Sequence, residues 1–161
     1  MSRNSLAPAL KVLVDLVDEA FDHRSWHGTT LRGSLRAVRE NDAAWRPGPA
    51  RHNIWEVAVH AAYWKYAVWR RLTGTKRGRF PRQGSNWFPC PDASGRRWRE
   101  DLALLDDMHA QLRETVAQLD PAALERRVGA AFTTAALVRG IAAHDLYHAG
   151  QVQLLKRLRG K

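Results

Sequence analysis

Residues 133–158 read T-T-A-A-L-V-R-G-I-A-A-H-D-L-Y-H-A-G-Q-V-Q-L-L-K-R-L, and this stretch decides the fold. Apolar residues and two histidines recur along it at spacings of three and four, at Leu137, Ile141, His144, His148 and Val152. This spacing is the period of one face of an α-helix, and it predicts a helix over residues 134–158. Two histidines therefore occupy positions where core side chains are expected.

Three further segments show the same period. Residues 6–22 and 94–119 carry apolar side chains every three or four positions, which predicts a helix in each. Residues 53–73 are predicted to form a helix that begins at Asn53, a favourable N-cap, with Glu56 placed to complete a capping box. Residues 31–38 form a shorter amphipathic piece, and no segment reads as a strand with a pairing partner.

These segments predict an all-α fold, a four-helix bundle. With 161 residues the chain is expected to be a single domain, residues 1–161, with a core that needs no disulfides. Gly74–Gly95, rich in Gly, Pro and Arg, is predicted to be a long crossover loop between the second and third helices. Its aromatic residues indicate that it packs over something, and Cys90 is interpreted as a loop thiol rather than a nucleophile.

Composition narrows the class of partner. The net charge of +10 raises the possibility of a polyanion such as nucleic acid, but 21 of the 26 basic residues are arginine and they are spread along the chain. We therefore do not favour nucleic acid as the partner.

The start of the chain lacks the features of a signal peptide, and no window approaches the roughly 18 apolar residues of a membrane span. We expect a cytoplasmic protein that does not bind membranes.

The two histidines of residues 134–158 predict a metal site. Side chains four residues apart on a helix can share one ion, and a metal satisfies two imidazoles that apolar neighbours cannot. His144-Asp145-Leu146-Tyr147-His148 superficially matches the zincin motif, but no His, Asp, Glu or Cys follows His148 as a third ligand. A di-iron site is also excluded, because it needs two Glu-x-x-His motifs and the chain offers one imperfect match before His60.

The third ligand is then expected from another helix, and His60 is the candidate. It lies on the apolar, small-residue side of residues 53–73, as His144 and His148 lie on theirs. Three histidines that leave positions open for water or substrate describe a catalytic site rather than a structural one. The remaining histidines are weaker candidates: His23, His27 and His52 lie at helix ends or in loops, and His109 is placed on the flank of its helix.

Several residues near this triad are candidates for further roles. Glu56 could accept a hydrogen bond from a ligand or shuttle a proton, although its capping-box position offers a structural role that we favour. Gln151 is expected to line the pocket, and Trp64 to lie one turn from His60. Asp145 could orient a histidine of a neighbouring subunit or pair with an arginine.

Several of these motifs, taken together, resemble the DinB-like family, also called YfiT-like metal-dependent hydrolases. The matching pieces span residues 26–158 in family order: Trp26-His27-Gly28, Trp45-Arg46-Pro47, His52-Asn53-Ile54-Trp55-Glu56 with His60, and His144-Asp145-Leu146-Tyr147-His148-Ala149-Gly150-Gln151. The last piece is the most specific.

This resemblance implies a four-helix bundle that binds a divalent ion, typically zinc or nickel, through His60, His144 and His148. Family members with assigned activities are similar to thiol-dependent S-transferases and isomerases that use mycothiol, bacillithiol or glutathione, and members often form homodimers. The leading hypothesis is a metal-dependent S-transferase or hydrolase of a small-molecule electrophile. Arginines of the run 76–82 could hold the carboxylates of a thiol cofactor.

Two rivals stay open. One is a non-enzymatic module that binds nucleic acid through its basic surface, with a structural or vestigial metal site. The other is a scaffold whose triad holds no metal.

Overall fold

The computed structural model describes residues 6–90 and 94–160 and confirms the all-α class. The helices are α1 (Pro8–Phe21), α2 (Leu31–Ser34), α3 (Glu40–Ala44), α4 (Ile54–Thr73), α5 (Gly95–Ala117) and α6 (Thr134–Arg159). A 3-10 turn at Pro121–Ala123 and the two short strands β1 (Arg127–Val128) and β2 (Phe132–Thr133) connect α5 to α6.

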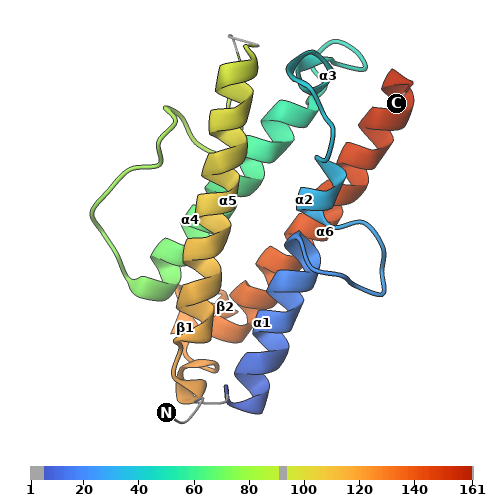
Figure 1. Ribbon diagram of the computed structural model, residues 1–161. Helices are drawn as coiled ribbons and strands as arrows, with labels where there is room; N and C mark the ends of the chain where they lie inside the picture. The colour runs from blue at the N-terminus through green and yellow to red at the C-terminus, as the bar shows by residue number, and fades with distance from the viewer. Residues whose placement is uncertain (1–5, 91–93, 161) are drawn as a thin grey trace.

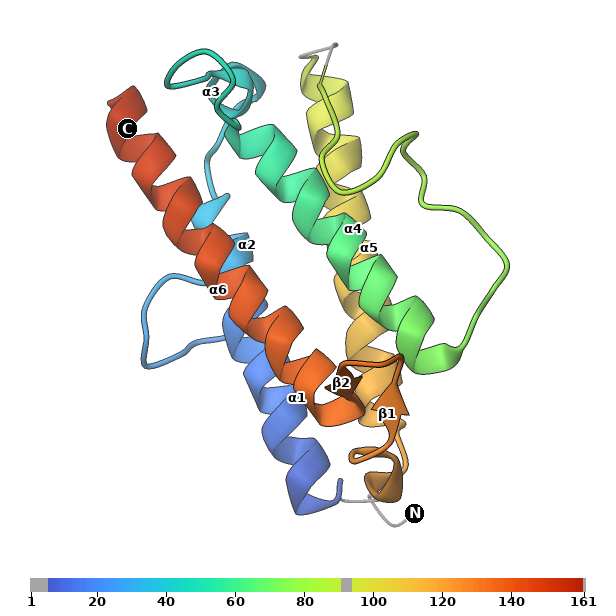
Figure 2. The same cartoon turned by 180° about the vertical axis from the view of Figure 1, so that it is seen from behind.

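The four long helices lie side by side, with α1 and α6 running one way and α4 and α5 the other (Figures 1 and 2). Helix α4 packs against both α5 and α6, and α1 packs against α6 and α5. Because α4 and α5 run in the same direction, the chain between them returns along the length of the molecule (Figure 1). Residues 91–93 of this connection lie outside the part of the chain that the structure describes.

Side-chain caps explain where α4 and α6 begin. The Asn53 side chain accepts a hydrogen bond from the backbone N–H of Glu56 at 2.8 Å, as the N-cap prediction requires. Thr133 caps α6 in the same way through Ala136, at 3.2 Å. Helix α4 ends at Gly74, whose φ of 69° is left-handed and suits glycine.

The expectation that no strand pairs is wrong in one place. Arg127 faces Thr133 and Val128 faces Phe132 in an antiparallel hairpin of two residues a side. Strands this short show no alternation in the sequence, so the pattern that reveals longer strands is missing. The hairpin leads directly into α6 and places Phe132 beside its first turns.

The core contains a charged pair that joins α4 to α6. Lys65 and Asp145 are only 0% and 1% exposed, and Lys65 Nζ donates a hydrogen bond to the Asp145 carboxylate. The expectation that Asp145 pairs with an arginine or reaches a neighbouring subunit is therefore wrong. Its partner is a lysine 80 residues earlier in the same chain, which no local pattern indicates.

His109 is also buried, contrary to its expected place on the flank of a helix. It stacks on Phe21 with ring centroids 3.7 Å apart, and its Nδ1 accepts from Lys65 Nζ at 3.4 Å. Burial, together with the nearby Lys65 charge, lowers the pKa of His109 to about 2. His109 is therefore a neutral acceptor that helps to solvate the Lys65 ammonium.

Breaking the Lys65–Asp145 pair from one side is expected to be strongly destabilising. Lys65→Met leaves the Asp145 carboxylate buried without its cation, and the expected loss is about 3–5 kcal/mol in the free energy of unfolding. The double variant Lys65→Met/Asp145→Leu removes both charges and should recover most of this loss. Urea unfolding of chelator-treated protein measures all three proteins.

Lys11 provides the matched control, because it pairs with Asp15 at the exposed surface of α1. Lys11→Met should change the free energy of unfolding by less than about 0.5–1 kcal/mol. Equal effects of the two lysine substitutions, or a double variant no more stable than Lys65→Met, would contradict a dominant role for the buried pair.

Candidate metal centre

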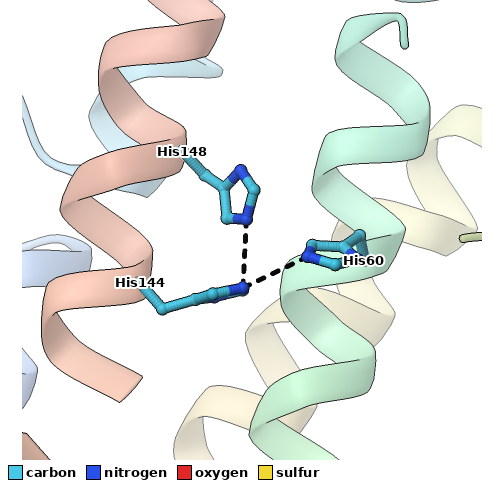
Figure 3. Close-up of side chains that lie close together, drawn as sticks. All are labelled: His60, His144 and His148. Carbon is cyan, nitrogen blue, oxygen red and sulfur yellow. Dashed lines mark hydrogen bonds between the residues drawn. The ribbon is translucent and has the colours of Figure 1, made fainter. Parts of the chain in front are cut away.

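Three histidines from two helices meet between α4 and α6. His60 comes from α4, while His144 and His148 lie one turn apart on α6 (Figure 3). The Nε2 atom of His144 lies 3.2 Å from that of His60 and 3.0 Å from that of His148. One ligand atom from each residue lies within 4.8 Å of the others, a spacing that fits a shared metal ion.

The helices that carry the histidines approach each other over small side chains. Ala58 and Ala61 on α4 and Ala149 on α6 are buried in the same core cluster. Interhelical distance depends on the side chains at the contact, so alanines let two imidazoles from α6 reach one from α4.

Hydrogen bonds on the far side of two rings set their orientation. The Nδ1 of His60 donates to the backbone carbonyl of Asn86 at 2.7 Å, and the Nδ1 of His148 donates to Oε1 of Gln151 at 2.6 Å. With the proton on Nδ1, the neutral ring presents an Nε2 lone pair to the cluster. Such contacts are the usual support of metal-binding histidines.

The three imidazoles are held in the neutral form. Burial lowers the pKa of His144 to about 3 and that of His148 to about 4, with a contribution from the neighbouring histidines in each case. Burial also lowers the pKa of His60, against the opposing effect of its Asn86 contact. Neutral nitrogens are what a metal requires of its ligands.

The donor set therefore fits a cation. His60 and His148 direct lone pairs at His144, whose single Nε2 can donate at most one proton to one of them. A divalent ion between the three atoms would satisfy all of them at once, with no carboxylate in the ligand set.

The connection after α4 closes one side of this cluster. Trp87 stacks on His60 with centroids 3.9 Å apart and on His52 with centroids 3.6 Å apart. The Asn86 side chain accepts from Nε1 of Trp64 at 3.0 Å, while its carbonyl holds His60. Trp87 of this segment thus packs over the histidine site itself, whereas Phe80 and Phe88 pack against Tyr63.

Sequence reasoning missed Asn86 and the role of His52. Asn86 has a φ of 62°, a left-handed conformation that asparagine tolerates better than most residues. Nothing periodic marks such a position, and the only signal was an Asn beside a Trp in a loop rich in Gly. His52 is an exposed loop residue, as expected, but it also stacks on Trp87 and hydrogen-bonds to the Glu56 carboxylate.

Glu56 lies one turn from His60 but binds other groups. Its carboxylate accepts from Arg46 at 2.9 Å, from His52 at 3.0 Å and from the backbone of Asn53. Burial alone would raise the pKa of Glu56, but these donors outweigh it and the pKa is lowered. The carboxylate is thus an ionised partner at the start of α4, which agrees with the structural role in a capping box.

Gln151 and Cys90 are also placed. Gln151 supports His148 through Nδ1, so it orients a candidate ligand rather than lining open space.

The half-buried Cys90 has its pKa raised to about 12, chiefly by burial and then by the Asp101 and Glu56 charges. A thiol so hard to ionise is a poor nucleophile, in keeping with the interpretation as a loop thiol.

Comparison with known proteins gives one family. The sequence matches the DinB superfamily over residues 23–152, most of its length. The chain belongs to the DinB superfamily. No curated protein and no solved structure matches it. Membership in this superfamily and the cluster of His60, His144 and His148 together fit a metal-binding site.

Within the described residues, every helix is too short or too polar to cross a membrane.

Asn86 provides a test of how the loop supports the site. Asn86→Gly keeps a left-handed backbone and the carbonyl that holds His60, so zinc affinity should fall by no more than about threefold. Asn86→Val disfavours that backbone and should weaken zinc binding by about 10–100-fold, as loss of a ligand's partner commonly does. Competition with a chromophoric chelator measures both affinities, and equal values for the two variants would refute this role.

Proposed function

We propose that this DinB superfamily protein is a divalent-metal-dependent enzyme whose ligands are His60, His144 and His148. The observation that carries the proposal is the convergence of three neutral Nε2 atoms with no carboxylate among them. Such a ligand set leaves the positive charge of a divalent ion uncompensated and leaves coordination positions for other molecules. Zinc or nickel is the proposed ion.

The proposed chemistry is thiol-dependent S-transfer, or hydrolysis, on a small electrophilic substrate. A bound divalent ion would supply Lewis acidity that lowers the pKa of a thiol or water. The chain itself contributes ring orientation through Asn86 and Gln151 and exclusion of water by Trp87 over His60. The buried pair of Lys65 and Asp145 holds together α4 and α6, the two helices that carry the histidines. The proposal includes a homodimer, as the family resemblance implies, and a cytoplasmic location, as the sequence predicts.

The rival function, nucleic acid binding by the basic surface, has less support from the contacts. Several arginines are engaged by carboxylates of other elements, among them Arg46 with Glu56, Arg82 with Asp101 and Arg113 with Asp18. These pairs give part of the arginine excess a structural explanation.

Metal content tests the ligand assignment. Purified protein should carry about one divalent ion per chain, and His148→Ala should lose it because two imidazoles bind much more weakly than three. His27→Ala, at an exposed position outside the cluster, is the control and should keep the ion. Elemental analysis gives the stoichiometry and circular dichroism checks the helices. Metal retained in full by His148→Ala would rule out the assignment.

A panel of thiols tests the reaction. With 1-chloro-2,4-dinitrobenzene, the expected reaction forms a carbon–sulfur bond, releases chloride and leaves the thiol proton in the buffer. Mycothiol, bacillithiol and glutathione are compared, with the absorbance of the conjugate as the readout. At least one thiol should react faster by about tenfold or more with metal-loaded protein than with His144→Ala. Metal-dependent release of chloride without any thiol would identify a hydrolase instead.

A further inference from the structure

A largely apolar cavity of about 340 Å³ opens beside His144. It lies between α4, the β1–β2 hairpin and the first turns of α6. Its walls include Trp64 and Val68 from α4, Phe132 from the hairpin and Ile141 from α6. A volume of this size suits a small molecule, and mostly apolar walls with a few polar groups are typical of ligand sites.

This cavity would give a small molecule access to the cluster of three histidines. His60 and His148 are 6% and 2% exposed, whereas His144 is only partly buried and is the member of the cluster that lines the cavity. Trp87 covers the ring of His60 from the loop, and Trp64 lies edge-on to both His60 and His144. A molecule in the cavity would therefore meet the cluster at His144.

Gly140 of α6 lines the cavity and is exposed, so a side chain added there has open space around it. A Cβ atom added at this glycine of α6 meets no atom within 4 Å. A larger side chain at this position would therefore be accommodated next to the cavity without a clash. Two neighbouring lining residues from α6, Leu137 and Ile141, are apolar.

Arg71 is the one permanently charged side chain among the described residues that line this cavity. Its guanidinium lies 5.7 Å from the ring of Trp64, and no acidic partner lies within salt-bridge distance in the described part of the chain. An unpaired guanidinium beside an apolar surface can bind a carboxylate through two parallel hydrogen bonds. The basic run 76–82, by contrast, contributes to a separate cavity that none of the three histidines lines.

We propose that this cavity is the subsite for the electrophilic substrate, a small apolar or aromatic molecule with a single carboxylate that pairs with Arg71. The proposal rests on the proposed function in that the adjoining histidines are taken as the reaction centre. A low-molecular-weight thiol with several charged and hydroxyl groups does not match these walls, because burying unpaired polar groups against them is unfavourable. The apolar subsite is thus assigned to the electrophile rather than to the thiol.

The probe is 4-phenylbutyrate, which combines an aromatic ring with one carboxylate, and its neutral amide is the comparison. Isothermal titration calorimetry on zinc-loaded protein should show binding of the acid, and weaker binding of the amide by about fivefold or more. Gly140→Leu should reduce the affinity for the acid by about tenfold or more, because leucine fills the cavity. Arg71→Gln should abolish the preference for the acid over the amide.

Two controls are matched to these variants. Gly150→Leu places the same side chain on the same helix at another open glycine, outside the cavity lining. Arg139→Gln removes an exposed α6 arginine that likewise does not line the cavity. Both should bind 4-phenylbutyrate as the unsubstituted protein does. Gly140→Leu and Gly150→Leu both remove a helical glycine, so neither is expected to lose stability through helix propensity.

Metal analysis of the same samples separates the two proposals. Zinc retained in every variant, together with probe affinity that is absent or indifferent to Gly140→Leu and Arg71→Gln, overturns the subsite and leaves the metal centre standing. Probe binding that these two variants weaken, in protein that takes up no zinc, supports the subsite and refutes the metal-dependent function.

Discussion

The arrangement of the three clustered histidines depends on the ion pair between Lys65 and Asp145. Both side chains are removed from water, so neither can leave its partner without exposing an uncompensated charge to an apolar interior. The pair lies close in sequence to the histidines: Lys65 follows His60 on α4, and Asp145 directly follows His144 on α6. Any slip of α4 along α6 that separated the histidines would also separate the charges. A buried pair of this kind adds little net stability compared with apolar side chains, but it is well suited to fixing one register between two helices.

In this register, contacts within the chain leave the Nε2 atoms of His60 and His148 as acceptors, whether or not an ion is bound. Burial keeps the rings neutral, and the Asn86 carbonyl and the Gln151 side chain accept hydrogen bonds from the Nδ1–H groups of His60 and His148. Lone pairs that face one another at about hydrogen-bond distance repel unless a proton or a cation lies between them. The loop after α4 contributes to this arrangement through the backbone of Asn86 and the indole of Trp87. A segment without regular secondary structure is therefore part of the site.

Features that depend on local periodicity could be predicted from the sequence. Most features that depend on contacts between distant residues could not. The helices at residues 53–73 and 134–158 and the shared face of His144 and His148 follow from spacing, because a helix converts sequence separation into a face. The meeting of His60 with them was predicted from its place on the apolar, small-residue side of its own helix. The partner of Asp145, the burial of His109 and the pairing of Arg46 with Glu56 each join residues whose proximity only the packed helices create. The β1–β2 hairpin is too short to show alternation, and the left-handed backbone of Asn86 leaves no pattern that a single sequence reveals.

The arginine content shows why net charge is a weak guide to function in this protein. Four arginines each bind a carboxylate on another element, namely Arg32, Arg46, Arg82 and Arg113. Their charges therefore help to hold helices and loops together. Arg71 differs, because it lies over Trp64 at an apolar cavity and has no such partner within the described chain. Arg71 is exposed to water, but its guanidinium is not already held by a carboxylate, so it is free to bind one through two parallel hydrogen bonds. Selectivity for a charged substrate is thus better inferred from one unpaired side chain beside His144 than from the +10 charge of the whole molecule.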